Sequence, residues 1–250
     1  MDRFFVSPGL LQSEHVELGG ELSHRLRHVL RLRAGDRVVL FDGSGFEYEV
    51  ALEDTGGPSI GATVLDRREG TPEPRVRVVL YQSVVKGDRF DWLLEKGTEL
   101  GVARFAPLLA SRGVVRPGPE RSARRERWLR IITEAAEQSG RSRLPELSQV
   151  MRLDEALSTA EGLRLFSWER EEGASLRRVL RHAVSEGKAP AAVSIFIGPE
   201  GGFTQEEADA AVAAGAQRVS LGRRILRSET AGIAAVTAVL YELGELGDQG

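Results

Sequence analysis

The hydrophobic and polar positions divide the chain into two stretches of different texture. Residues 3–68 consist mainly of short strand-like runs, and in 36–52 the turn residues DGSG at 42–45 separate two apolar runs. A glycine-containing turn between apolar runs predicts a β-hairpin. Residues 22–32 break the pattern, because their apolar positions roughly follow helical spacing. This stretch predicts a small β-barrel or sandwich that carries one basic helix.

After residue 74 the apolar runs alternate with amphipathic segments. Residues 69–74, EGTPEP, read as a linker by their glycine, prolines and charge, and we place a domain boundary there. Strands separated by helices predict a mostly parallel sheet with helices on both faces. The predicted strands are 76–85, 102–109, 163–168, 193–197 and 218–221, and the predicted helices are 88–101, 120–139, 153–160, 174–185, 204–215 and 229–243.

Two strand–loop–helix units in tandem, within residues 193–243, form the strongest candidate for a ligand site. The first strand runs into the loop GPEGG at 198–202, whose glycines permit positive φ and close backbone approach. Thr204 precedes Glu207 by the spacing of a capping box, which predicts a helix start. The second strand runs into an irregular loop, 222–228, which is followed by a helix rich in small residues.

The first loop excludes some common ligands. It does not match the dinucleotide fingerprint G-x-G-x-x-G, and the phosphate-binding G-x-x-x-x-G-K-[ST] motif is absent from the sequence. Glu200 at its centre would repel a pyrophosphate. NAD and ATP are therefore poor candidates, and a ligand with a positive charge or none fits better. The alternative interpretation of the glycines is a tight turn that joins strand to helix.

The second loop alternates arginines with apolar residues. Arg227 stands beside Ser228, which can cap the following helix, and a helix start offers donors to a phosphate or carboxylate. Three solvated arginines at a loop tip are the alternative. The charged residues at helical spacing in 95–99 and 134–141 are by themselves typical of surface salt links.

Charge changes this picture more than composition does. The 250 residues, 41% hydrophobic and 28% charged, are those of an ordinary globular protein with a net charge of −3. However, 112–143 holds nine arginines against four glutamates, and 22–35 holds four arginines and no acid. Guanidinium groups suit phosphate contact and base stacking, so a basic face suggests a nucleic-acid partner. A solvated, arginine-rich helix face explains the same charge equally well.

Several classes of function are excluded or disfavoured. The chain has no cysteine, which removes disulfides, thiolate zinc sites and cysteine nucleophiles. Its four histidines, at 15, 24, 28 and 182, show no metal-ligand spacing, so we predict no metal site. The first residues lack the pattern of a secretory signal, and no apolar run approaches the roughly 20 residues needed to cross a bilayer. We therefore expect a cytoplasmic protein without membrane contact.

Four motifs, in order along the chain, together resemble one family. They are EKGTELG at 95–101, AEQSGR at 136–141, IGPEGGF at 197–203 and LGRRILRSETA at 221–231. The set is similar to the bacterial small-subunit (16S) ribosomal RNA (uracil-N3)-methyltransferases of the SPOUT superfamily. HVLR at 28–31 and LFDG at 40–43 resemble the PUA-like barrel of the same family, so the resemblance covers the whole chain.

The resemblance implies a specific fold and chemistry. Residues 1–70 would form a PUA-like β-barrel that binds RNA, and 74–246 an α/β domain with a parallel sheet. The last strands and loops would thread into a C-terminal trefoil knot, which general topology rules would not suggest. The knot would hold S-adenosylmethionine, whose cationic sulfonium is compatible with Glu200. The family also implies a homodimer that acts on ribosomal RNA or the small ribosomal subunit.

The site residues follow from the matching motifs. RNA contacts are expected from Arg25, Arg27, Arg31, Arg33 and Arg141. Binding of S-adenosylmethionine is expected from Phe166, Ile197, Gly198, Pro199, Gly201, Gly202, Leu221, Gly222, Ile225, Leu226, Thr230 and Ala231.

Methylation at N3 of uridine requires the loss of an imide proton. We expect Arg227 to stabilise the uracilate or anchor the target phosphate, and Glu200, Glu229 or a water held by one of them to take the proton. The sequence does not decide between the two roles of Arg227 or among the candidate proton acceptors. Alternatives for the whole protein are a SPOUT methyltransferase of another position, either a 2′-O-ribose or a transfer RNA, and a non-catalytic RNA-binding ribosome-assembly factor.

Overall fold

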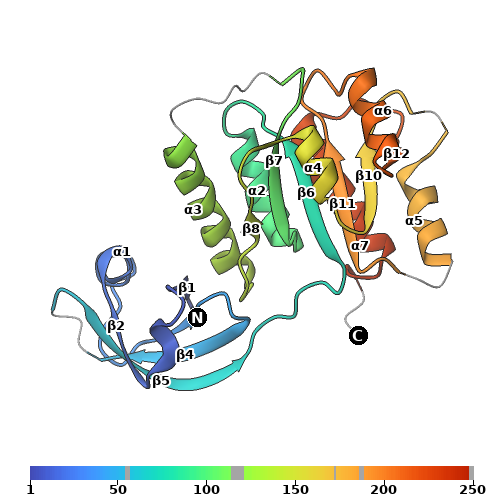
Figure 1. The fold of residues 1–250 in the computed structure, drawn as a ribbon. Coiled ribbons are helices and arrows are strands. Elements are labelled where there is room, and N and C mark those ends of the chain that lie inside the picture. Colours follow the sequence, from blue (N-terminus) through green and yellow to red (C-terminus); the bar gives the residue numbers. More distant parts are fainter. Residues whose placement is uncertain (54–56, 114–120, 172, 186–188, 248–250) are drawn as a thin grey trace. The chain divides into compact units, whose positions relative to one another are not determined.

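The chain forms two compact units, which Figure 1 shows as a ribbon. The first consists of 1–73 and 133–144, and the second of 74–132 and 145–250. Residues 133–144 thus pack with a part of the chain that lies far away in sequence. The predicted helix start at Glu120 and the basic residue Arg116 lie outside the described residues. The computed structural model describes residues 1–53, 57–113, 121–171, 173–185 and 189–247.

The first unit is built on a five-stranded sheet in the order β1-β3-β4-β5-β2. β1 and β3 are parallel and the remaining neighbours are antiparallel. The β3–β4 hairpin turns at 42–45, as its DGSG sequence predicts. β1 and β2 lie at the two edges, and among the described strands no pairing between them closes the sheet into a barrel. The strands are β1 (Arg3–Phe5), β2 (His15–Leu18), β3 (Arg37–Phe41), β4 (Phe46–Leu52) and β5 (Ile60–Glu69), and a 3-10 turn, η1, covers Leu10–Gln12.

The predicted helix over 22–32 is shorter and of mixed type. α1 (Gly20–His24) continues into a π-helical turn, η2 (Arg25–Val29), which is closed by a hydrogen bond of 3.0 Å from the Leu30 amide to the Arg25 carbonyl. Leu26 is fully buried in the core of this unit. Arg31 follows with a φ of 57°, in the left-handed region, and ends the helical run.

A buried carboxylate ties residues 133–144 to the sheet. Glu47 on β4 accepts hydrogen bonds from Arg3 (2.8 Å), Ser142 (2.8 Å) and Arg68 (3.2 Å). Burial alone would raise the pKa of Glu47, but these hydrogen bonds and the charge of Arg3 outweigh it and lower the pKa to about 2. The folded unit therefore stabilises the ionised form.

We predict that Glu47→Gln destabilises the protein at neutral pH by about 3 kcal/mol, because the lowering of the pKa from 4.5 to about 2 corresponds to roughly that free energy. The folded pKa is depressed, so the stabilisation is complete above pH 4.5 and is lost as the pH falls towards 2. The difference between wild type and variant, measured by urea unfolding, should narrow below pH 4.5. Glu49→Gln, which removes a more exposed pair with Arg37, is the control and should cost less than about 1 kcal/mol. A pH-independent difference for Glu47→Gln would contradict the assignment.

The second unit contains a seven-stranded sheet, whose order is β12-β10-β11-β6-β7-β8 with β9 also paired to β7. Its pairings are all parallel among the described strands. The predicted parallel α/β sheet is confirmed. The strands are β6 (Arg77–Ser83), β7 (Arg104–Leu109), β8 (Glu146–Leu147), β9 (Met151–Arg152), β10 (Leu163–Ser167), β11 (Ala192–Ile197) and β12 (Gln217–Val219).

Helices cover both faces of this sheet (Figure 1). Successive strand residues point to opposite faces. Val78 and Leu80 therefore pack in one cluster with α2, α3, α5 and α7, whereas Val79 and Tyr81 pack in the other with α4 and α6. None of the described helices has the length and apolarity to cross a membrane. The helices are α2 (Arg89–Leu100), α3 (Arg121–Ser139), α4 (Leu153–Thr159), α5 (Leu176–Ser185), α6 (Gln205–Ala213) and α7 (Ser228–Glu242).

The start of α6 follows the sequence pattern closely. The Thr204 hydroxyl accepts from the Glu207 amide (3.2 Å), and the Glu207 carboxylate accepts from the Thr204 amide (2.7 Å). This is the predicted capping box. It fixes where the glycine loop after β11 ends, and so sets the length of that loop.

Candidate functional site

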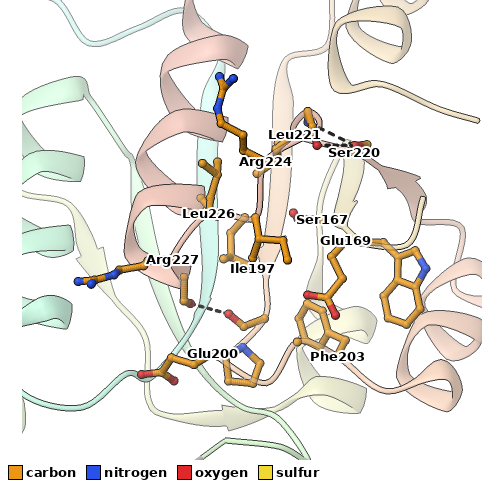
Figure 2. Close-up of a pocket in the computed structure, with 18 of the residues that line it drawn as sticks. Ser167, Glu169, Ile197, Glu200, Phe203, Ser220, Leu221, Arg224, Leu226 and Arg227 are labelled. Atoms are coloured by element: carbon orange, nitrogen blue, oxygen red, sulfur yellow. Dashed lines mark hydrogen bonds between the residues drawn. The ribbon is translucent and has the colours of Figure 1, made fainter. Parts of the chain in front are cut away.

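Three neighbouring parallel strands deliver their loops to one edge of the sheet. β12, β10 and β11 are adjacent, and a ligand in an open parallel sheet binds beyond the carboxyl ends of the strands. The loops that follow them enclose a cavity of about 300 Å³ (Figure 2). Its lining comes from 167–169 at the end of β10, from 197–200, 202 and 203 at the end of β11, and from 220–228 with Ala231 after β12.

One serine joins the loops of this cavity. Ser228 is buried, and its hydroxyl donates to the Gly198 carbonyl (2.5 Å), a bond drawn in Figure 2. The same hydroxyl accepts from the Gln82 amide nitrogen (2.8 Å) at the end of β6. The prediction that Ser228 caps α7 is wrong, because the helix begins at Ser228 itself and its side chain bonds to other loops. Gln82 carries no local sequence signal, since only the parallel sheet brings it here.

We predict that Ser228→Ala lowers the free energy of unfolding by about 1–3 kcal/mol, because it removes the two hydrogen bonds that this buried hydroxyl makes with Gly198 and Gln82. The binding of any ligand held by both loops should weaken too. Urea unfolding measures the first effect. Ser158→Ala, an exposed serine on α4 that bonds only within its own helix, is the matched control and should be close to neutral. Equal stability of the two variants would contradict the role given to Ser228.

The glycine loop is shaped by close approach. Gly202 has a φ of 66°, and a Cβ there would lie 2.8 Å from a carboxylate oxygen of Glu169. A Cβ at Gly198 would crowd the Phe203 ring at 3.1 Å. These glycines therefore let the backbone pass where a side chain would not fit. The predicted ligand loop is thus a constrained structure, and Glu169 stands against it.

Charges of both signs surround the cavity. Glu169 and Glu200 supply carboxylates, and three arginines, 223, 224 and 227, come from the loop after β12. Apolar side chains such as Ile197 and Leu226 lie between them (Figure 2). The cavity can therefore hold a small molecule that combines a flat apolar part with charged groups. Among the described residues no cluster of three or more potential metal ligands occurs.

Arg89 was not anticipated from the sequence. It is the first residue of α2, and its guanidinium lies 2.7 Å from Glu200 Oε1 and 3.9 Å from Glu229 Oε2. Glu229 is buried, and its Oε2 has no hydrogen-bond partner among the described residues. The position of Arg89 follows from the parallel sheet, because the loop after β6 ends at the same edge as the others. Arg89 thus links a carboxylate of the loop after β11 with one in the first turn of α7.

The structure gathers most of the predicted ligand residues around the cavity. Gly201 instead lies beside it, where its carbonyl accepts from Arg112, and Thr230 lies on the exposed side of α7. Phe166 is fully buried behind the cavity, with its ring centroid 4.3 Å from that of Phe203, so its side chain does not reach the lining. The predicted residues in the lining are Ile197, Gly198, Pro199, Glu200, Gly202, Leu221, Gly222, Ile225, Leu226, Arg227 and Ala231.

The sequence missed the segment after β10, where Ser167, Trp168 and Glu169 line the cavity. Nothing in its local pattern indicates a site. Its position next to β11 comes from the order of the strands, in which β10 lies between β11 and β12.

The arginines predicted to contact RNA lie in the first unit, in different environments. Arg25 pairs with Glu137 at 2.8 Å, and Arg27 donates to the Gly57 carbonyl at 2.6 Å. Arg31 and Arg33 are exposed, and their guanidinium groups have no partner among the described residues. Arg141 requires a correction: it is only 7% exposed and its guanidinium binds Glu73. Its role is to hold 133–144 in place, since it offers little surface to RNA.

Fold and site define an α/β protein that carries a small β domain and has a cavity at the carboxyl edge of a parallel sheet. Residues 71–240 match the family described as RNA methyltransferase domain, and 18–65 match the RNA methyltransferase PUA domain. The chain belongs to this RNA methyltransferase family, as its motifs indicate.

Relatives agree over the full length of the chain. The ribosomal RNA small subunit methyltransferase E of Bacillus subtilis is 30% identical and covers 100% of both chains. That of Synechocystis is 35% identical over 95% of this chain and 76% of the relative. The structure of ribosomal RNA small subunit methyltransferase E from Neisseria gonorrhoeae, bound to S-adenosyl methionine, is 32% identical with a TM-score of 0.85, over 96% of this chain and 97% of that one.

Proposed function

We propose that the protein transfers a methyl group from S-adenosylmethionine to N3 of a uridine in small-subunit ribosomal RNA. The observation that carries the proposal is the cavity formed by the loops after β10, β11 and β12, in a chain similar throughout to ribosomal RNA small subunit methyltransferases E. The similar Neisseria gonorrhoeae structure is bound to S-adenosyl methionine.

The residues of the cavity fit this cofactor. A volume of about 300 Å³ lies at the lower end of small-molecule pockets. Ile197, Leu221 and Leu226 offer apolar contacts for an adenine ring, and the carboxylates of Glu169 and Glu200 suit the positive charges of the sulfonium and amino groups. When bound, the cofactor supplies an electrophilic methyl group.

The chain's own residues handle the charge and the proton. Arg227 lines the cavity, and its cation stabilises the uracilate that forms when N3 loses its proton. Glu200 and Glu229, the two carboxylates next to Arg89, are the candidate proton acceptors. The rate–pH profiles of Glu200→Gln and Glu229→Gln separate them, because the variant that lacks the acceptor loses the acidic limb of the profile.

We predict that Arg227→Ala slows single-turnover methyl transfer about 100-fold, the usual loss when one stabilising donor is removed from a reaction centre. Arg227→Lys should recover part of the rate because it restores the charge. Calorimetry should show little change in the affinity for S-adenosylmethionine. Arg178→Ala, on the exposed side of α5, is the control. A normal single-turnover rate for Arg227→Ala would exclude this role.

The test of the proposed reaction is methyl transfer to unmodified small-subunit particles and to their free RNA. Digestion and mass spectrometry of the nucleosides should identify 3-methyluridine. A 2′-O-methylated nucleoside, or transfer RNA as the better acceptor, would identify a different methyltransferase. No binding of S-adenosylmethionine in calorimetry would indicate a non-catalytic RNA-binding factor.

Arg31 and Arg33 form the best-placed RNA contact of the first unit, because both are exposed and uncommitted. The double variant Arg31→Glu/Arg33→Glu should weaken RNA binding and reduce its salt dependence by about 0.7–0.9 in log–log slope per lost phosphate contact. Affinity for S-adenosylmethionine should stay the same. Arg178→Glu is the charge-matched control. Wild-type RNA affinity of the double variant across several salt concentrations would reject the contact.

The proposal includes a trefoil knot in 74–246 and a homodimer. In support of the knot, Ser220 after β12 forms a parallel bridge with Ser175, and the chain then enters α7, which packs beside α2.

In support of the dimer, Ile225 is 91% exposed and Tyr241 is 69% exposed, and a second copy of the chain could cover both side chains. Tracing of the chain in a crystal structure tests the knot. Sedimentation equilibrium tests the homodimer, and a monomer in that measurement would contradict it.

A further inference from the structure

A second cavity adjoins the first around the start of α7. It measures about 580 Å³ and is lined by the loop before α2, by the first turns of α2, and by Arg227, Glu229 and Thr230. Arg227 lines both cavities. The Arg227 side chain can therefore contact a group bound in either cavity.

Cations without partners gather at this cavity. The side chains of Lys86 and Arg227 are exposed and form no hydrogen bond or ion pair with the described residues. Arg89, in the same lining, pairs with Glu200 and lies near Glu229. The side chains of Lys86 and Arg227 can therefore contact an anionic group such as a phosphate.

An exposed aromatic ring completes the lining. Trp92 is 42% exposed, whereas Trp128 and Trp168, the other two tryptophans, are each 5% exposed. Asp88 and Asp91, close to Trp92 in sequence, form ion pairs with Arg127. An indole at the surface next to cations is the combination that binds a nucleobase by stacking and its phosphate by charge.

We propose that this second cavity is the subsite for the target nucleotide, with the base against Trp92 and the phosphate against Lys86, while Arg227, which lines both cavities, faces the uracil. The inference rests on the proposed function and extends it. A base that reacts must leave its stack to reach the methyl donor, and it then needs a new surface to stack on. Trp92 provides that surface, Arg227 is shared with the first cavity, and the Glu229 carboxylate lies in the same lining.

The experiment compares Trp92→Ala, Trp92→Phe and Lys86→Glu with wild type on unmodified small-subunit particles. Trp92→Ala should raise KM about tenfold, the usual loss for one stacked base. Lys86→Glu should also raise KM about tenfold, because it replaces a phosphate contact with a repelling charge. The affinity of both variants for S-adenosylmethionine in calorimetry should stay constant. Trp92→Phe should recover most of the loss because it keeps an aromatic face. The controls are Val212→Ala, an exposed apolar residue on α6, and Arg178→Glu on α5.

Fluorescence gives a readout independent of turnover. Of the three tryptophans only Trp92 is exposed enough to be reached, so a uridine-containing fragment of the small-subunit RNA should quench the emission of wild type. Trp92→Phe should abolish the quenching while it still methylates.

The outcomes separate the two proposals. A wild-type protein that methylates no ribosomal RNA refutes the proposed function itself. An active wild type with unchanged KM for Trp92→Ala and Lys86→Glu overturns only the subsite. A Trp92→Ala protein that loses self-association but keeps its RNA constants also overturns it, because a second copy then covers the ring.

Discussion

The hydroxyl of Ser228 is the atom on which the geometry of the site depends. It donates to the carbonyl after β11, accepts from an amide at the end of β6, and stands at the first residue of α7. Three segments are thereby held at hydrogen-bond distance, although the end of β6 lies more than a hundred residues from the other two in sequence. Because the serine is buried, water does not compete for these bonds. The loops around the cavity thus have a fixed spacing before any ligand arrives.

Near the hydrogen bonds of Ser228, some charged side chains form ion pairs and others do not. Arg89 pairs with Glu200 in the loop after β11 and lies near Glu229 in the first turn of α7. The side chains of Arg227 and Lys86 have no partner among the residues that the structure describes. Paired charges define the local structure, whereas unpaired ones keep their attraction for a ligand. The two cavities differ in character: the first has apolar side chains between its charged groups, and the second has one exposed indole beside Lys86 and Arg227.

In the first unit, too, hydrogen bonds to a single buried side chain hold distant segments together. Glu47 accepts from Arg3, Ser142 and Arg68, and this network fixes residues 133–144 on the sheet. The arginines of this unit consequently divide by burial. Arg141 is buried against Glu73, whereas Arg31 and Arg33 are exposed. Charge counts along the chain do not make this distinction, because they treat each guanidinium alike.

The sequence by itself determined the local elements and the family. The DGSG hairpin, the capping box at Thr204, the parallel α/β pattern and the two ligand loops are encoded within short windows, so propensity and periodicity reveal them. Only the tertiary structure decided the rest: the contribution of 167–169, the salt links of Arg89, the bond from Gln82 to Ser228, and the burial of Phe166 and Arg141. These depend on which strands are neighbours. Strand order is a result of packing over the whole chain, and no local window contains it.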